Sequence, residues 1–175
     1  YNTEYISVKK NGDVNVGNGG PWTELKFFRE GGGGGAGGSF KLPYVFKVSG
    51  KEVVIQNKAG GDFDKFLRVK PGDLGKPDSQ GGKGEFARFI VELDGDKARF
   101  KSKKTGKYLR IMANDEINVE GGTGPLTLFK VKGDGNLRKL ESNKFPGKYI
   151  SVKKNGDVNI GNGGPWTELK FFRDN

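Results

Sequence analysis

The chain contains no cysteine and no histidine among its 175 residues. Without cysteine there is no disulfide framework, no thiol nucleophile and no thiolate metal site. Without histidine the commonest general base and the commonest zinc ligand are missing, so a Ser-His-Asp triad cannot form. We therefore expect a protein that is not an enzyme and that uses no metal and no cofactor.

Long apolar runs are also missing, and none approaches the ~18 residues that a membrane-spanning helix needs. Hydrophobic residues make up only 33% of the chain, whereas glycine accounts for 31 of its residues. No segment has the 3.6-residue apolar period that is typical of an amphipathic helix. This pattern favours many short strands joined by tight turns, and the predicted fold class is all-β.

One long segment occurs twice in the chain. Residues 5–29 and 149–173 differ at a single position, where the first copy has Val16 and the second has Ile160. The copies lie 144 residues apart, and a run of sequence GGGGGAGGS follows the first of them. We predict three parts: a partial copy (1–30), a glycine-rich linker (31–39) and a folded domain (40–175).

A second and weaker repeat lies inside the domain. The stretches DKFLRV, GKYLRI and GKYISV carry the aromatic residues Phe66, Tyr108 and Tyr149, which are 42 and 41 residues apart. A strand-like run precedes each stretch, and a glycine-rich turn and another apolar run follow it. Each unit of ~41 residues thus holds about four short strands. Three such units predict a β-trefoil, in which a barrel and three hairpins are related by pseudo-threefold symmetry.

Two details of the strand pattern lead to further predictions. In the hairpin VKKNGDVNI, Asn155 and Gly156 can take the two positive-φ positions of a type I′ turn. The first copy repeats this turn at Lys10-Asn11-Gly12-Asp13, and it adds three strands that match the third unit. The segment 40–50 (FKLPYVFKVSG) resembles one more strand, so the chain holds more strand-like runs than a trefoil has places.

The units resemble the β-trefoils of the fascin and hisactophilin type. In that family a basic or polar strand is followed by G-K-Y-L and a small or apolar residue. GKYLRI at 106–111 and GKYISV at 147–152 match this motif, and DKFLRV at 64–69 is a looser match. The resemblance covers nearly all of 40–175. It implies a cytoplasmic protein that binds or bundles actin, or one that associates with acidic membranes.

The formal net charge of +10 is confined to the domain, because residues 1–30 sum to zero and the linker is uncharged. A basic domain favours anionic partners such as F-actin, acidic lipid or a sulfated glycan, although a charged surface also serves solubility. The candidate binding residues recur in successive units, so we expect them around the pseudo-threefold axis, unless they are ordinary solvated edges and turns. They are Lys101, Lys103, Lys104, Lys107 and Arg110 in the second unit, and Lys144, Lys148, Lys153 and Lys154 in the third.

Two tryptophans follow a Gly-Gly-Pro sequence, Trp22 in the first copy and Trp166 in the second. Each is either a rim aromatic for a ligand or a plug at one end of the barrel. A carbohydrate-binding lectin is therefore one functional interpretation. The Q-x-W triplet of ricin-type trefoil lectins does not occur in the chain.

The duplication points to a different function, that of a structural and self-assembling repeat protein whose main partner is itself. Residues 5–29 can dock in their own barrel, enter a neighbouring molecule and propagate a filament, or belong to a tandem array of ~144-residue modules. An array of this kind suits an extracellular location. An engineered duplication that allows strand exchange is a further interpretation. Actin or acidic-membrane binding and lectin activity remain the alternatives.

Overall fold

The computed structural model describes residues 5–8, 14–17, 50–57, 65–133 and 137–173. The chain forms two compact units, Tyr1–Leu42 and Pro43–Asn175. The predicted linker at 31–39 and the predicted extra strand at 40–50, except for Gly50, lie outside the described residues.

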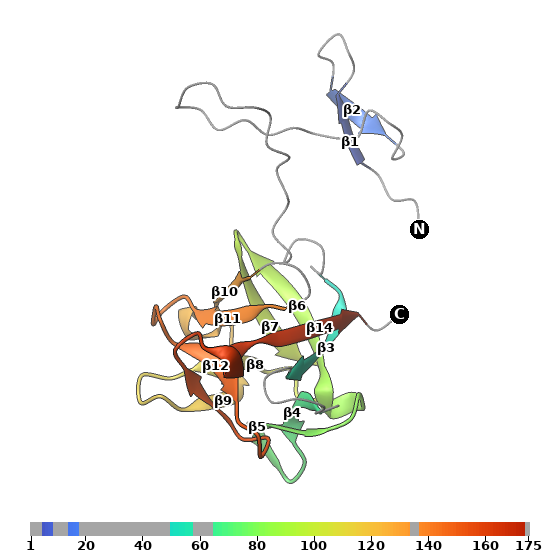
Figure 1. Cartoon of the computed structure of the whole chain (residues 1–175). Coiled ribbons are helices and arrows are strands. Elements are labelled where there is room, and N and C mark those ends of the chain that lie inside the picture. The colour runs from blue at the N-terminus through green and yellow to red at the C-terminus, as the bar shows by residue number, and fades with distance from the viewer. Residues whose placement is uncertain (1–4, 9–13, 18–49, 58–64, 134–136, 174–175) are drawn as a thin grey trace. The chain divides into compact units, whose positions relative to one another are not determined.

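The described residues of the larger unit form strands and three short 3-10 helices, so the all-β prediction is confirmed (Figure 1). Its first eight strands are β3 (Glu52–Asn57), β4 (Phe66–Lys70), β5 (Asp73–Gly81), β6 (Arg88–Asp94), β7 (Lys97–Ser102), β8 (Tyr108–Ile111), β9 (Ile117–Gly121) and β10 (Phe129–Lys132). The last four strands are β11 (Lys139–Ser142), β12 (Tyr149–Val152), β13 (Val158–Gly161) and β14 (Leu169–Arg173). The 3-10 helices η2 (Glu85–Ala87), η3 (Pro125–Thr127) and η4 (Pro165–Thr167) precede β6, β10 and β14.

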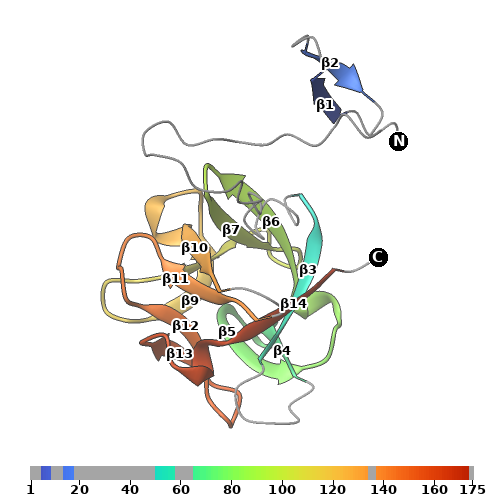
Figure 2. The same ribbon diagram turned by 45° about the horizontal axis from the view of Figure 1, so that its top comes forward.

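Six of these strands form a nearly closed, barrel-like sheet (Figure 2). Antiparallel pairs join β3 to β6, β6 to β7, β7 to β10 and β10 to β11. The last strand, β14, pairs with the first, β3, over five residues. A bridge between Arg138 and Leu169 joins β14 to the residue before β11. Closure leaves few exposed strand edges, which are the sites where sheets aggregate.

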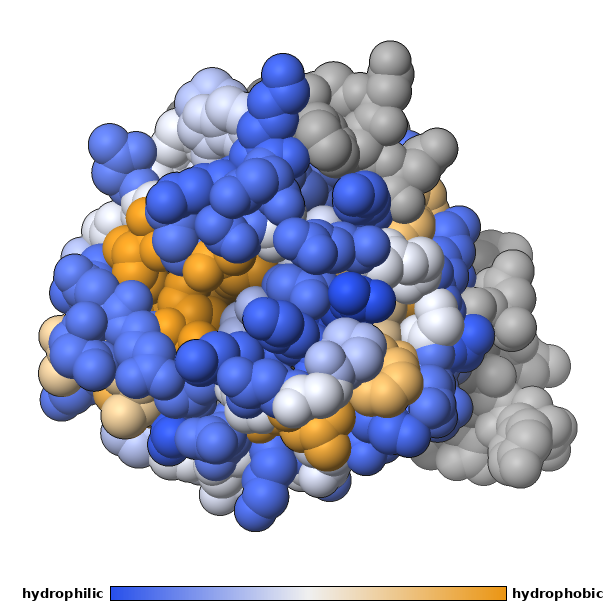
Figure 3. Space-filling model, turned by 90° about the horizontal axis from the view of Figure 1, so that it is seen from below, coloured by the Kyte–Doolittle hydropathy of each residue, from blue (hydrophilic) through white to orange (hydrophobic). Residues whose placement is uncertain are grey.

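Three hairpins, β4–β5, β8–β9 and β12–β13, branch from this sheet through pairs with β3, β7 and β11. The pairing pattern therefore repeats every four strands along the chain. The hairpins also contact one another, since Ser79 N–H donates to the Gly156 carbonyl at 2.8 Å. The face on which the hairpins lie is mostly hydrophilic around an apolar hollow (Figure 3).

The core follows from the period-2 alternation of the strands. In β7, Ala98, Phe100 and Ser102 are buried while the residues between them are partly exposed. Phe89, Phe100 and Phe129 are among the largest fully buried side chains. The rings of Phe100 and Phe129 pack edge to face with centroids 6.0 Å apart. These contacts make one continuous apolar core inside the barrel-like sheet.

The smaller unit contains the hairpin of β1 (Tyr5–Val8) and β2 (Val14–Gly17). Its register pairs Tyr5 with Gly17 and Val8 with Val14. Strands β12 and β13 are paired in the corresponding register, Tyr149 with Gly161 and Val152 with Val158. The same sequence thus forms the same hairpin twice. The third predicted strand of the first copy (24–29) lies outside the described residues.

The type I′ turn predicted for the hairpin β12–β13 is wrong. Only Gly156 has a positive φ, of 89°, and Asn155 does not. The Gly156 N–H donates to the Lys153 carbonyl at 2.9 Å, and the Lys153 N–H donates to the Asp157 carbonyl at 2.8 Å. This is the hydrogen bonding of a type I turn followed by a left-handed glycine, another common hairpin solution. The equivalent turn at 10–13 lies outside the described residues.

Candidate functional site

Five of the nine predicted basic residues form ion pairs with carboxylates of the domain. Lys103 Nζ lies 2.7 Å from Glu52 Oε2, and Lys104 Nζ lies 2.8 Å from Glu85 Oε1. Lys148 pairs with Asp115. The remaining pairs are Lys101 with Glu92 at 3.7 Å and Arg110 with Glu120 at 3.6 Å. These pairs neutralise much of the local positive charge that an anionic partner would meet.

The other four predicted residues are exposed: Lys107, Lys144, Lys153 and Lys154. None of them has an ion-pair partner within the part of the chain that the structure describes. Lys107 lies in the loop before β8 and Lys144 in the loop before β12. Lys153 and Lys154 lie together in the turn between β12 and β13, where they line a pocket.

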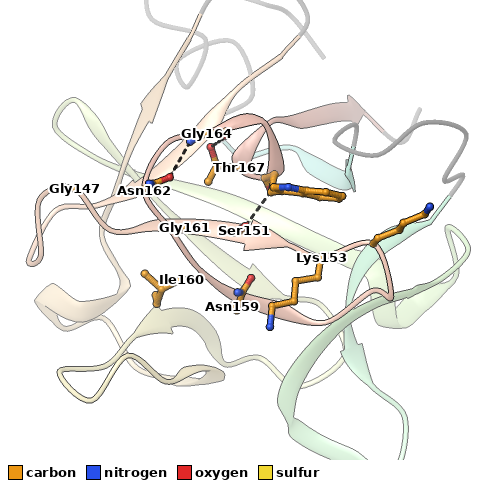
Figure 4. Close-up of a pocket in the computed structure, with 11 residues that line it drawn as sticks. Gly147, Ser151, Lys153, Asn159, Ile160, Gly161, Asn162, Gly164 and Thr167 are labelled. Atoms are coloured by element: carbon orange, nitrogen blue, oxygen red, sulfur yellow. Dashed lines mark hydrogen bonds between the residues drawn. The ribbon is translucent and has the colours of Figure 1, made fainter.

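The pocket is a hollow of about 630 Å³ at the third hairpin, β12–β13, in the last of the three four-strand repeats (Figure 4). Strand β12, the turn after it, strand β13 and helix η4 supply almost all of its walls. The lining residues are Gly147, Ser151, Lys153, Lys154, Asn159, Ile160, Gly161, Asn162, Gly164, Trp166 and Thr167. A volume of this size falls within the ~300–1,000 Å³ that is usual for small-molecule sites.

A missing arginine explains why the third unit is hollow here. Strands β4, β8 and β12 each begin with an aromatic residue. Two positions later, β4 has Arg68 and β8 has Arg110, whereas β12 has Ser151. The two arginines lie across their hairpins and donate from Nε, at 2.6 Å in each case, to Asp78 Oδ1 and to Asn118 Oδ1. Ser151 is too short to cross its hairpin, and its hydroxyl donates instead to the Trp166 carbonyl at 3.2 Å.

The third hairpin also lacks a bulge that the other two have. The registers of β4–β5 and β8–β9 shift next to the arginine, whereas the register of β12–β13 is regular. In both bulged hairpins the side chain that accepts from the arginine also accepts from the backbone N–H two residues later. Gln80 N–H donates to Asp78 at 3.1 Å, and Glu120 N–H donates to Asn118 at 3.3 Å. At this place the third hairpin has one residue fewer, since Asn159 is two positions before Gly161 whereas Asn118 is three before Gly121, and it makes no such bond.

Asn159 is left without both of these donors. It pairs with Ser151 across the hairpin, as Asn118 pairs with Arg110 in the second unit. Its Oδ1 is buried and has no hydrogen-bond partner among the described residues. An unpaired buried acceptor costs roughly 1–3 kcal/mol. The pocket therefore holds a polar group whose hydrogen bonding is incomplete.

Trp166 supplies the aromatic wall of the pocket. It lies in η4, where the Thr167 hydroxyl donates to the Gly164 carbonyl at 2.6 Å and fixes the short helix. Trp166 is 42% exposed and lines the pocket, so it does not plug the barrel. The equivalent position is Phe86 in η2 and Leu126 in η3. Trp22, the predicted counterpart in the first copy, lies outside the described residues.

The pocket is electropositive because its lining includes two lysines and no carboxylate. A smaller hollow of about 370 Å³ shares Lys153 and Asn159 with it and is also lined by Lys70 and by Lys76, which is ion-paired with Asp73 at 3.6 Å. The carboxylates of that hollow belong to Asp78, which is paired with Arg68, and to Asp157, which accepts from the Asn155 amide at 2.7 Å. The arrangement can therefore attract a small anion-bearing ligand.

A buried carboxylate beneath this hairpin stabilises the domain. Glu141 Oε2 lies 2.7 Å from Lys132 Nζ, and its Oε1 accepts from Gly147 N–H at 2.9 Å and from the Tyr149 hydroxyl at 3.1 Å. Burial alone would raise the pKa of Glu141, but these hydrogen bonds outweigh it and hold that pKa below its usual value. Glu52 behaves similarly, since the hydrogen bond from Lys103 lowers its pKa.

No protein-family model matches the chain, and no curated protein is significantly similar to it. No helix among the described residues is long and apolar enough to cross a membrane. In the same part of the chain, no three or more Asp and Glu side chains are grouped closely enough to hold a metal ion.

Sequence reasoning found Lys153, Lys154 and Trp166 but missed Ser151 and Asn159. The available signal was a comparison of the three predicted hairpins, which reads Arg68, Arg110 and then Ser151 at one position. Because two repeats have arginine at this position and the third has the much smaller serine, the comparison indicates a place where the third repeat has space.

Proposed function

We propose that the chain belongs to a non-catalytic structural repeat protein in which β-trefoil modules follow one another through glycine-rich linkers. Residues 40–175 are one module, and residues 5–29 are the last three strands of another. The observation that carries this proposal is the shared register of the hairpins β1–β2 and β12–β13, formed by segments 144 residues apart.

The β-trefoil part of the proposal is supported by the strand pairing. Each group of four strands contributes two strands to the barrel-like sheet and one hairpin outside it. The pair β3–β14 brings the first and last groups together, as pseudo-threefold symmetry requires. The fascin and hisactophilin motif at 106–111 and 147–152 supports the same fold.

The two copies compete for one place in the barrel, and small differences favour the second. A swap replaces partly buried Ile160 by Val16, and an Ile to Val change in a core typically costs 0.5–1.5 kcal/mol. Residues 149–173 also follow β11 directly, so that a shorter loop closes when they pair. We therefore expect residues 149–173 to close the barrel and residues 5–29 to complete a different module.

Strand exchange between molecules is the competing form of this proposal. It offers each barrel almost the same contacts, so it gains little free energy to offset the entropy of association. Actin or acidic-membrane binding, which the family resemblance implies, is a second candidate. A broad cationic surface is not favoured, because Lys101, Lys103, Lys104, Arg110 and Lys148 are ion-paired within the domain.

Size-exclusion chromatography with light scattering, over about a hundredfold range of protein concentration, tests the proposal. A tandem module predicts a monomer of 19.1 kDa throughout. Dimers or polymers that grow with concentration would instead favour strand exchange. In that case Leu25→Asp should abolish them, because its counterpart Leu169 is fully buried in the barrel.

A further inference from the structure

We propose that the pocket of the third unit binds an anionic sugar, a pyranose ring that carries a sulfate or a carboxylate. This site is independent of the tandem arrangement, since the domain alone supplies all of its walls. The proposal stands on the space, the polar group, the aromatic wall and the charge of the pocket.

The space exists because two features of the other units are absent. In the first and second units an arginine crosses the hairpin, Arg68 or Arg110, and in both a bulge brings one more residue to the same spot. The third unit has Ser151 and no bulge. A ligand can therefore occupy the volume that a side chain fills in the two other hairpins.

The polar group is the Asn159 amide, which lies beside Ser151 and Lys153 in the hairpin (Figure 4). Its Oδ1 is buried without a partner, at the position where the two other hairpins supply an arginine donor. Asn159 itself lines the pocket, so a ligand bound there lies next to this amide. A sugar hydroxyl, which both donates and accepts, can then complete its hydrogen bonding.

The aromatic wall is Trp166, which is 42% exposed. An indole face gives a large apolar area to the C–H face of a ring, and Tyr or Trp side chains are common in such binding surfaces because they lose little conformational entropy. Ile160 adds a second apolar contact within the same lining.

The charge decides between sugars. Lys153 and Lys154 line the pocket without a carboxylate beside them in the lining, and Lys70 lines the adjoining hollow. The two lysines would repel a ligand that carries a guanidinium or amine group. A cationic ligand is therefore not expected to take the place of the missing arginine. A hydroxylated ring with one anionic group satisfies the aromatic wall, the amide and the lysines together.

Titration by ¹⁵N-HSQC NMR tests this inference, with galactose 6-sulfate, galactose and inorganic sulfate as probes of the full chain. We expect galactose 6-sulfate to shift the Trp166 indole and Asn159 side-chain signals, and to bind at least about tenfold more tightly than either other probe. Sulfate that binds as tightly as the sulfated sugar, or shifts confined to other residues, would overturn the proposal.

The decisive variant is Ser151→Arg, which restores the residue seen at positions 68 and 110 and fills the pocket. We expect it to weaken binding of galactose 6-sulfate by at least about tenfold. The matched control is Ser7→Arg, the same change in the first copy, which should bind as the parent chain does. Circular dichroism establishes that both variants fold. Undiminished binding by Ser151→Arg, or loss with Ser7→Arg alone, would contradict the assignment.

Two further variants keep the test independent of how an arginine packs in a hairpin without a bulge. Trp166→Ala removes the exposed aromatic wall, and Lys153→Gln with Lys154→Gln removes the charge. Trp166→Ala should weaken the binding of galactose and of galactose 6-sulfate. The double lysine variant should weaken the binding of galactose 6-sulfate only. Binding that responds to neither change would place the sugar elsewhere.

Discussion

At the scale of single residues, the domain combines a cationic surface with carboxylates that are fixed in place. Glu141 shows this most clearly, since its side chain is 6% exposed and receives hydrogen bonds from Lys132, Tyr149 and the Gly147 backbone. A carboxylate held in this way stabilises the fold only while it is ionised.

The lowered pKa of Glu141 predicts how stability depends on pH. Its contribution is fully present above the unfolded pKa of about 4.3 and is lost as the pH falls through the lower folded pKa. We expect Glu141→Gln to reduce the free energy of unfolding at pH 7 by about 1.5–3 kcal/mol, as for hydrogen bonds to charged groups. The variant should also lose less stability than the parent between pH 5 and 2.

Urea denaturation at a series of pH values measures both effects. The control is Glu116→Gln, because Glu116 is exposed and, among the described residues, its side chain accepts one long hydrogen bond, from the Asn118 amide at 3.4 Å. Equal effects of the two substitutions at every pH would contradict the role given to Glu141.

At the scale of elements, the hairpins differ in how they end. Gly156 lies at the tip of β12–β13 with φ at +89°, and a Cβ there would meet the Ser79 carbonyl oxygen at 2.9 Å. Gly72 lies at the tip of β4–β5 with a similar φ of +86° but has nothing within 4 Å. The two glycines therefore separate the cost of the backbone conformation from the cost of contact between hairpins.

We expect Gly72→Ala to cost about 1–2 kcal/mol, the usual price of a left-handed non-glycine residue. Gly156→Ala should cost at least about 1 kcal/mol more, because overpacking against a neighbouring backbone adds its own strain. Thermal or chemical denaturation of the two variants gives the comparison. A smaller loss for Gly156→Ala would mean that the hairpins do not pack as described.

Much of the fold could be predicted from these elements. The spacing of Phe66, Tyr108 and Tyr149 anticipates three groups of strands because each aromatic begins the first strand of a hairpin. The turn type at Asn155 and Gly156 could not be read from the residues, since both a type I′ turn and a type I turn with a left-handed glycine accept Asn-Gly.

The candidate site was harder to predict, because its properties depend on contacts between distant segments. Lys103 is neutralised by Glu52 and Lys148 by Asp115, residues that lie 51 and 33 positions away along the chain. No local pattern in the sequence reveals such pairs. The pocket itself results from a residue that is missing, which only a comparison between units can show.

At the scale of the whole molecule, the duplicated segment carries most of the pocket. Ten of its lining residues, from Ser151 to Thr167, have counterparts in the first copy, and the one difference is Val16 for Ile160. If each module of an array contains this segment, the array presents the same pocket repeatedly. Linked sites bind a polymeric ligand far more tightly than one site does, provided that the linkers span the spacing.

Residues 149–173, and not their copy, close the barrel-like sheet through the pairing of β14 with β3. Lys170 in β14 lies opposite Gln56 in β3, and the copy has Lys26 at the equivalent position. Because the chain has no cysteine, a pair of introduced thiols reports on one contact only. The paired variants are Gln56→Cys with Lys170→Cys, and Gln56→Cys with Lys26→Cys.

The measurement is the yield of cross-linked chain after mild oxidation, read by mass spectrometry of the non-reduced protein. Residues directly opposite in antiparallel strands have Cβ atoms ~4.5–5.5 Å apart, close enough for a disulfide after a small adjustment. We expect a high yield within the chain for Lys170→Cys and almost none for Lys26→Cys. Efficient cross-linking of Lys26→Cys, within one chain or between two, would contradict it.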